Sequence, residues 1–268
     1  MSLRMKFWGV RGSIACSSPD CVVYGGNTSC VEVEAGGHHI ILDAGTGIRD
    51  LGRHFMRAGV THAVLLMSHT HWDHISGFPF FAPAFVPGNA FHVMAGHLTM
   101  DRGVQHILES QMTNPMFPVP MAAMKSHLTF TDFLAGDSFT LFDEIAVRTA
   151  RLNHPNDATA YRLDYGGVSV CYVTDTEHVP GHPDRNVLSL IEGADLVIYD
   201  ATYDEAEFPS KLGWGHSTWE EGVRLCRAAG ARRLAIFHHA PEHDDAFMAN
   251  LEAEAHAAWS GTFAARDN

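Results

Sequence analysis

Four potential metal ligands lie within six residues of this chain, in the segment His69-Thr70-His71-Trp72-Asp73-His74. The preceding run, Ala63–Met67, is apolar and predicts a buried strand. Residues two apart on a strand share a face, so the first two histidines can bind one ion together, while the last two residues can face a second ion. Because imidazole nitrogens with few carboxylates suit zinc, the segment predicts a site for two zinc ions. A histidine-rich loop that binds no metal is the alternative, and this ligand spacing disfavours it.

Such a site needs ligands from elsewhere in the chain, and each candidate follows an apolar run. His154 follows the run 145–147 after a short polar stretch, Asp175 closes the strand pattern 168–174, and His238 closes the run 234–237. Ligand sites in sheets cluster at the carboxyl ends of strands, where side chains leave the core. These three residues therefore complete the candidate set. His239 is the alternative to His238 as the ligand. We prefer His238 because it directly continues the strand.

Motifs along nearly the whole chain give it a family resemblance. The pattern His-x-His-x-Asp-His at 69–74 is followed in order by a His, an Asp and a His. Further motifs are Asp200-Ala201-Thr202-Tyr203, Gly215-His216-Ser217-Thr218, and the turn elements 25–30 and 42–47. On these residues, which span about Phe7 to Asp245, the chain resembles the metallo-β-lactamase superfamily and, within it, the ribonuclease Z and phosphodiesterase branch. The resemblance implies an α/β fold: a four-layer αββα sandwich of two mixed β-sheets packed face to face, with helices on both outer sides.

The resemblance also implies a role for each site residue. One zinc ion would be held by His69, His71 and His154, the other by Asp73, His74 and His238, with Asp175 bridging the two. Manganese or iron are possible substitutes for zinc. Asp43 matches a position that supports the ligating imidazoles from behind.

The catalytic residues implied by the resemblance are Asp73 and His216. A hydroxide held between the two ions would attack phosphorus, and Asp73 would orient it while also binding metal. His216 would give a proton to the departing oxygen. The expected enzyme is a metal-dependent hydrolase of phosphodiesters.

The chain organisation predicts one domain over residues 1–268, with two βα halves that meet near residue 135. An insertion at about 80–130, with a Pro- and Met-rich stretch Gln111–Met124, is expected to lie over the site. After His216 a helix is expected, with Ser217 and Glu220 as its capping box and Gly230 as its stop.

Charge separates the candidate substrates. Lys and Arg number 18 against 31 Asp and Glu, a net charge of −13, whereas proteins that bind long nucleic acid usually carry a basic surface. Only 20 residues separate His154 from Asp175, which leaves no room there for the protruding arm that grips tRNA in ribonuclease Z. We therefore expect a small phosphodiester, of the cyclic nucleotide or cyclic ribose phosphate type. The alternatives are a thioesterase or lactonase of the same fold, and an RNA 3′-processing endonuclease.

Two further expectations concern surroundings and partners. No apolar run reaches the roughly 20 residues of a membrane span and the first residues lack a signal-peptide core, so a cytoplasmic location without membrane contact is expected. A homodimer is possible, because the Met-rich loop can serve as an interface. Aromatic residues near the metal segment, Trp72, Phe78, Phe80, Phe81 and Phe85, can stack on a nucleobase or belong to the core.

Overall fold

The strands form two mixed sheets in the computed structural model, which describes residues 3–98 and 103–267. The first sheet has the order β1 (Leu3–Gly9), β2 (Cys30–Ala35), β3 (His38–Leu42), β4 (His62–Met67), β5 (Ala90–Ala95), β6 (His127–Asp132). The second has the order β13 (Thr262–Ala264), β12 (Leu234–Phe237), β11 (Leu196–Asp200), β10 (Val168–Val173), β9 (Ala158–Tyr165), β8 (Ile145–Leu152), β7 (Ser138–Leu141). In both sheets antiparallel pairs at one edge give way to parallel pairs at the other.

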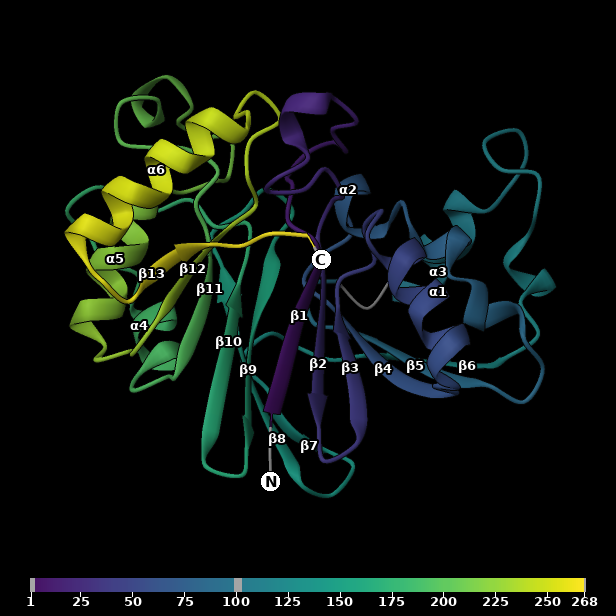
Figure 1. Cartoon of the computed structure of the whole chain (residues 1–268). Helices are drawn as coiled ribbons and strands as arrows, with labels where there is room; N and C mark the ends of the chain where they lie inside the picture. Colours follow the sequence, from purple (N-terminus) through teal and green to yellow (C-terminus); the bar gives the residue numbers. More distant parts are fainter. Residues whose placement is uncertain (1–2, 99–102, 268) are drawn as a thin grey trace.

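Helices cover the outer faces of both sheets (Figure 1). The first sheet carries α1 (Ile48–Ala58) and α3 (Val104–Gln111), and the second carries α4 (Arg185–Ile191), α5 (Trp219–Ala228) and α6 (Asp245–Ala258). A single turn, α2 (Trp72–Ile75), follows β4. Short 3-10 turns occur at Pro19–Cys21, Phe78–Phe80, Ala82–Phe85, Met121–Ala123 and Phe208–Ser210. The expected fold class, two mixed sheets with helices on both outer sides, is confirmed.

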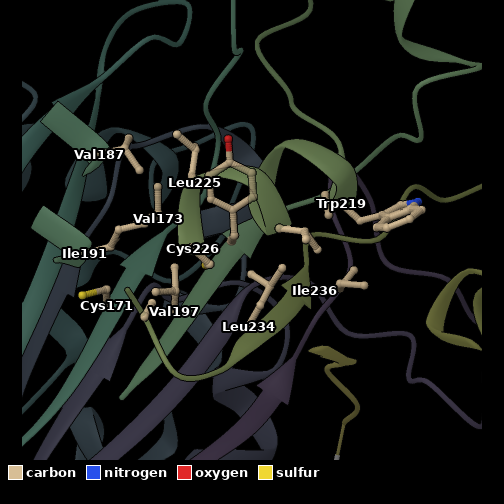
Figure 2. Packing of buried hydrophobic residues seen from close by; sticks show 14 of the residues in the cluster. Cys171, Val173, Val187, Ile191, Val197, Trp219, Leu225, Cys226, Leu234 and Ile236 are labelled. Carbon is tan, nitrogen blue, oxygen red and sulfur yellow. The ribbon is translucent and has the colours of Figure 1, made fainter. Parts of the chain in front are cut away.

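Three apolar layers hold the sandwich together. The middle layer joins the inner faces of the two sheets, where the ring of Phe237 lies 6.0 Å from Phe7 and 5.6 Å from Tyr172. The hydroxyl of Tyr161 in the second sheet donates to the Met67 carbonyl at the end of β4, at 2.6 Å. The outer layers pack helices onto each sheet, and Figure 2 shows the layer beneath α4 and α5. Burial of these side chains fixes how the strand ends of the two sheets face each other.

The two sheets divide the chain at residues 133–137, close to the expected meeting point of the halves near 135. The interval 80–130, expected from the sequence to be an insertion over the site, contains all of β5 and part of β6. The interval therefore contributes two strands to the first sheet as well as the segments that connect them. The residues between these strands carry α3 and the Pro- and Met-rich stretch.

The capping residue of α5 differs from the expectation by one position. Thr218 is the N-cap, and its hydroxyl accepts from the Glu221 backbone N–H at 3.2 Å. The Ser217 hydroxyl is engaged elsewhere, with His178 at 2.8 Å and Tyr199 at 3.0 Å. Gly230 follows the helix in a left-handed conformation, as expected. Among the helices of residues 3–98 and 103–267, none is long and apolar enough to cross a membrane.

Candidate metal centre

The candidate ligands gather where strands of both sheets end. Asp43 follows β3, Asp175 lies two residues beyond β10, and His238 follows β12. All three adopt left-handed backbone conformations, with φ of 62°, 54° and 63°. Such values are uncommon for residues other than glycine and cluster at functional sites. Here they mark the points where the chain leaves a strand and bends sharply.

The backbone conformation of the segment 69–74 differs from the strand that its spacing predicts. β4 ends at Met67, so His69 and His71 lie in the loop beyond it and not on the strand itself. The backbone at His71 is extended, with φ −65° and ψ 155°, and the turn of α2 begins at the next residue. The two imidazoles nevertheless come together, with ring centroids 4.5 Å apart.

The structure brings the seven expected ligands into two adjoining groups. The potential ligand atoms of each group lie within 4.8 Å of one another. The first group is His69, His71 and His154, and the second is Asp73, His74, Asp175 and His238.

Asp175 faces both groups with a different oxygen. Its Oδ2 lies 3.7 Å from Nε2 of His69 and 3.7 Å from Nε2 of His154. Its Oδ1 lies 3.2 Å from Nε2 of His74 and 3.4 Å from Nε2 of His238. One buried carboxylate therefore spans the two groups.

Hydrogen bonds behind the imidazoles decide which nitrogen faces the cluster. His154 donates from Nδ1 to the Gly215 carbonyl at 2.7 Å, and His74 donates from Nδ1 to the Asp43 carboxylate at 2.8 Å. His238 Nδ1 lies 2.9 Å from the Thr202 hydroxyl. With Nδ1 protonated, each ring directs a lone pair from Nε2 towards the cluster, as metal ligation requires.

The atoms of the cluster fit a cation. His69 Nε2 is buried and has no hydrogen-bond partner among the described residues. Nε2 of His74 lies 3.3 Å from Nε2 of His238, so when both rings carry their proton on Nδ1 two nitrogen lone pairs face each other. Buried polar atoms without partners are rare, and a positive ion between the lone pairs would satisfy both. A donor set of imidazoles and carboxylates is the type that divalent metals use.

The pKa shifts of the first ligand group and of Asp175 favour the metal-binding forms, whereas at His74 the carboxylates of Asp175, Asp73 and Asp43 outweigh burial and raise the pKa well above its ordinary value. Burial lowers the pKa of His69 well below its ordinary value, and nearby His74 lowers it further. Burial likewise lowers the pKa of His71 and of His154. Burial opposes ionisation of Asp175, but the charges of His238 and His74 outweigh it and hold the pKa of that carboxyl well below its usual range. Neutral imidazoles and an ionised carboxylate are the forms that bind metal.

His216 lies beside the cluster and forms a pair with Asp200. Its Nδ1 donates to Asp200 Oδ2 at 3.0 Å, and its ring stacks on His238 with centroids 4.8 Å apart. Burial disfavours the charged imidazole, but the Asp200 carboxylate outweighs this and raises the pKa of His216 to about 9. The pairing with Asp200 therefore favours the protonated form of His216, next to the cluster.

Other residues of the site were not identified from the sequence. Asp200 supports His216, and the Ser13 backbone N–H donates to Asp73 Oδ2 at 2.7 Å. Gly12 lies so close to His238 that a Cβ added there would be 2.3 Å from the imidazole. The motif Asp200-Ala201-Thr202-Tyr203 was the available signal for Asp200, whereas the contacts of residues 12 and 13 depend on the fold. His239 lies outside the cluster, and its Nε2 donates to the Ala265 carbonyl at 2.9 Å.

Comparison with known proteins identifies the family. The β-lactamase superfamily domain matches residues 38–239. Ribonuclease Z of Haloarcula marismortui is 25% identical over 89% of this chain and 86% of its own length. Among solved structures, the metallo-β-lactamase fold protein YhfI from Bacillus subtilis has a TM-score of 0.76 at 18% identity, covering 99% of this chain and 97% of its own. A diphosphatase from the PhnP family has a TM-score of 0.71 at 17% identity, covering 100% and 96%.

The chain belongs to the β-lactamase superfamily. With the ribonuclease Z relatives and the fold, this membership makes it a metal-dependent hydrolase that resembles the ribonuclease Z branch. The fold implies binding of a divalent metal, and the structure has a His/Asp cluster at the strand ends that could hold one.

Proposed function

We propose that this protein hydrolyses small phosphodiesters, of the cyclic nucleotide or cyclic ribose phosphate type, at a centre of two zinc ions. The observation that carries the proposal is the position of Asp175, whose two oxygens face the two ligand groups separately. His69, His71 and His154 would hold one ion, and Asp73, His74 and His238 would hold the other. Asp175 would contribute to both, so both halves of the chain would supply ligands and residues 1–268 would act as one catalytic domain.

When bound, two zinc ions supply Lewis acidity that activates water near neutral pH and neutralises charge on the phosphoryl group. Side chains of the protein orient the attacking water and donate the proton. Asp73, whose Oδ2 accepts from the Ser13 backbone N–H at 2.7 Å, would orient the attacking water. His216 gives the proton on its Nε2 to the departing oxygen, and Asp200 holds the ring in place through Nδ1.

The departing group distinguishes phosphodiesters from thioesters. An alkoxide is a poor leaving group and needs a proton, which His216 supplies. A thiolate leaves without one, so the buried pair of His216 and Asp200 would bring a thioesterase little benefit. This pair therefore favours the phosphodiester over the thioester alternative.

The net charge of the chain and the short connection in the second sheet favour a small substrate. The net charge of −13 opposes a long polyanion. The interval between His154 and Asp175 is filled by β9 and β10, which are joined directly through Gly166 and Gly167. A diphosphatase is also among the proteins of similar fold. Relatives of this sequence are nevertheless ribonucleases Z, so RNA 3′-processing is the second candidate.

A substrate panel tests the proposal. Zinc-loaded protein is assayed on 2′,3′- and 3′,5′-cyclic nucleotides, cyclic ribose phosphates, a thioester and precursor tRNA. We expect turnover of at least one small diester, its loss in His71→Ala and Asp73→Ala, and its loss on chelation with recovery on adding zinc. Trimming of precursor tRNA with all small diesters inert would support the second candidate instead, and full activity of metal-free protein would contradict both.

A further inference from the structure

A pocket of about 440 Å³ opens beside the metal segment. Thr70 and Trp72, which alternate with the ligands of this segment, form part of its wall. The opposite wall comes from the 3-10 turn Phe78–Phe80, from α3 and from the loop that follows it. Its volume falls within the usual range for sites that bind small molecules. The pocket is thus continuous in sequence with the candidate catalytic centre.

The aromatic residues near the metal segment divide into two sets. Phe78 and Phe81 are buried in the core, each about 1% exposed. Trp72 is 79% exposed and Phe80 is 54% exposed, and both line the pocket. The ring of Phe117 meets Phe80 edge to face, with centroids 5.7 Å apart. Large exposed aromatic surfaces next to a catalytic centre are a platform for stacking.

The lining suits an uncharged group. It contains no Asp, Glu, Lys or Arg, although the protein as a whole is acidic. Its polar side chains are short hydroxyls and Gln111, whose Nε2 donates to the Ile75 carbonyl at 3.3 Å. A phosphodiester has an anionic centre and two organic substituents. The metal ligands match the anion, and this neutral aromatic pocket matches one of the substituents.

The positions of His216 and of the pocket in different halves of the chain indicate which substituent the pocket binds. His216, the proposed proton donor to the departing oxygen, comes from the second half and stacks on His238. The pocket is built entirely from residues 70–117 of the first half. We infer that the pocket formed by Trp72, Phe80 and Phe117 binds a flat aromatic group, such as a nucleobase or an aryl ring, on the substituent that stays attached to phosphorus. This inference rests on the proposed phosphodiesterase function.

Two diesters with the same leaving group test it. Bis-p-nitrophenyl phosphate retains an aryl group after cleavage and methyl p-nitrophenyl phosphate retains a methyl group, while both release p-nitrophenolate. Trp72→Ala should lower kcat/KM for the bis-aryl diester by about 5- to 150-fold, the range expected for loss of one stacking partner, and change the methyl diester less than twofold. Trp214→Ala, which removes a tryptophan of 60% exposure outside the pocket, should leave the ratio of the two values unchanged.

A binding measurement separates failure of this inference from failure of the proposed function. In protein labelled with 5-fluorotryptophan, the ¹⁹F signal of Trp72, assigned by its loss in Trp72→Ala, should shift with phenyl methylphosphonate and not with methyl methylphosphonate. If wild-type protein cleaves neither diester, the phosphodiesterase proposal fails whatever this signal does. If both diesters are cleaved and Trp72→Ala lowers them equally or not at all, the pocket assignment is wrong. A change from dimer to monomer in Trp72→Ala with an unchanged ratio would make this face a subunit interface and would also overturn it.

Discussion

Replacement of Asp43 by Asn should weaken metal binding although Asp43 is not one of the proposed ligands. Its Oδ2 accepts from three donors: the Ser68 hydroxyl at 2.7 Å, His74 Nδ1 at 2.8 Å and the Tyr172 hydroxyl at 2.8 Å. Its Oδ1 accepts from the Ser68 backbone N–H at 2.7 Å. Asparagine keeps the shape of the side chain, and it tolerates the left-handed backbone that Asp43 adopts.

The amide cannot serve all of these donors. If its oxygen keeps the Ser68 backbone N–H, its NH₂ faces the other three donors. The two hydroxyls can rotate and accept, but the Nδ1–H of His74 cannot. His74 must then move its proton to Nε2, which removes the lone pair directed at the cluster. Loss of one hydrogen bond to a charged group costs about 1.5–3 kcal/mol, and loss of an orienting partner lowers metal affinity about 10- to 100-fold.

Competition with a coloured chelator measures the zinc affinity of Asp43→Asn. Glu32→Gln is the matched control, because Glu32 is also a buried carboxylate held by a histidine, with His39 Nδ1 and Trp8 Nε1 each at 2.9 Å, but it is not part of the cluster. Both variants should lose stability, whereas only Asp43→Asn should lose zinc affinity. Equal zinc affinity in the two variants would refute the claim that Asp43 sets the proton position on His74.

Three further predictions follow from the same contacts. His216→Ala should lower kcat about 10²- to 10⁴-fold for diesters with alkoxide leaving groups. The loss should be much smaller for diesters that release p-nitrophenolate, because this leaving group needs no proton. Equal losses of kcat for the two kinds of diester in steady-state assays would argue against His216 as a proton donor. Burial alone would raise the pKa of Glu32, but hydrogen bonds from His39 and Trp8 lower it. The ionised Glu32 therefore stabilises the fold above its unfolded pKa of about 4.5, and this stability is lost as pH falls through the lower folded pKa. In urea unfolding between pH 3 and 6, the free energy of unfolding should fall less steeply with decreasing pH in Glu32→Gln than in the wild type. Gly12→Ala should displace the His238 ring and weaken zinc binding, whereas Gly52→Ala, within α1 and with its nearest contact at 3.0 Å, should leave zinc affinity unchanged in the same competition assay.

The sequence predicted the parts of the site that depend on strand ends. Asp175 and His238 follow runs whose apolar character is explained by the buried middle and outer layers, so the end of each run predicted where a side chain would leave the sheet. The same reasoning was less successful at residues 69–71, because the apolar run stops at Met67 and the loop geometry beyond it has no periodic signal. The motif itself, and not strand geometry, carried the prediction there.

Contacts between distant residues could not be predicted in this way. Thr218 caps the helix instead of the expected Ser217, because the Ser217 hydroxyl is hydrogen-bonded to His178 and Tyr199. These two residues lie 39 and 18 residues away in sequence. Phe78 is buried where the 3-10 turn Phe78–Phe80 packs against α1, whereas Trp72 is exposed, and no local pattern in the sequence distinguishes the two residues. Tertiary packing therefore decided which polar and aromatic groups remained available to a ligand.

The left-handed conformations of Asp43, Asp175 and His238 connect the fold to the proposed chemistry. Each costs free energy relative to an ordinary backbone, and such conformations persist only where the surrounding structure determines them strongly. That support comes from strands β3, β10 and β12, whose side chains fill the layers of the sandwich. Because the three bends occur at strand ends of both sheets, any relative movement of the sheets would separate Asp175 from His69 and His74. The face-to-face packing that stabilises the fold is therefore also what sets the spacing of the proposed metal ligands.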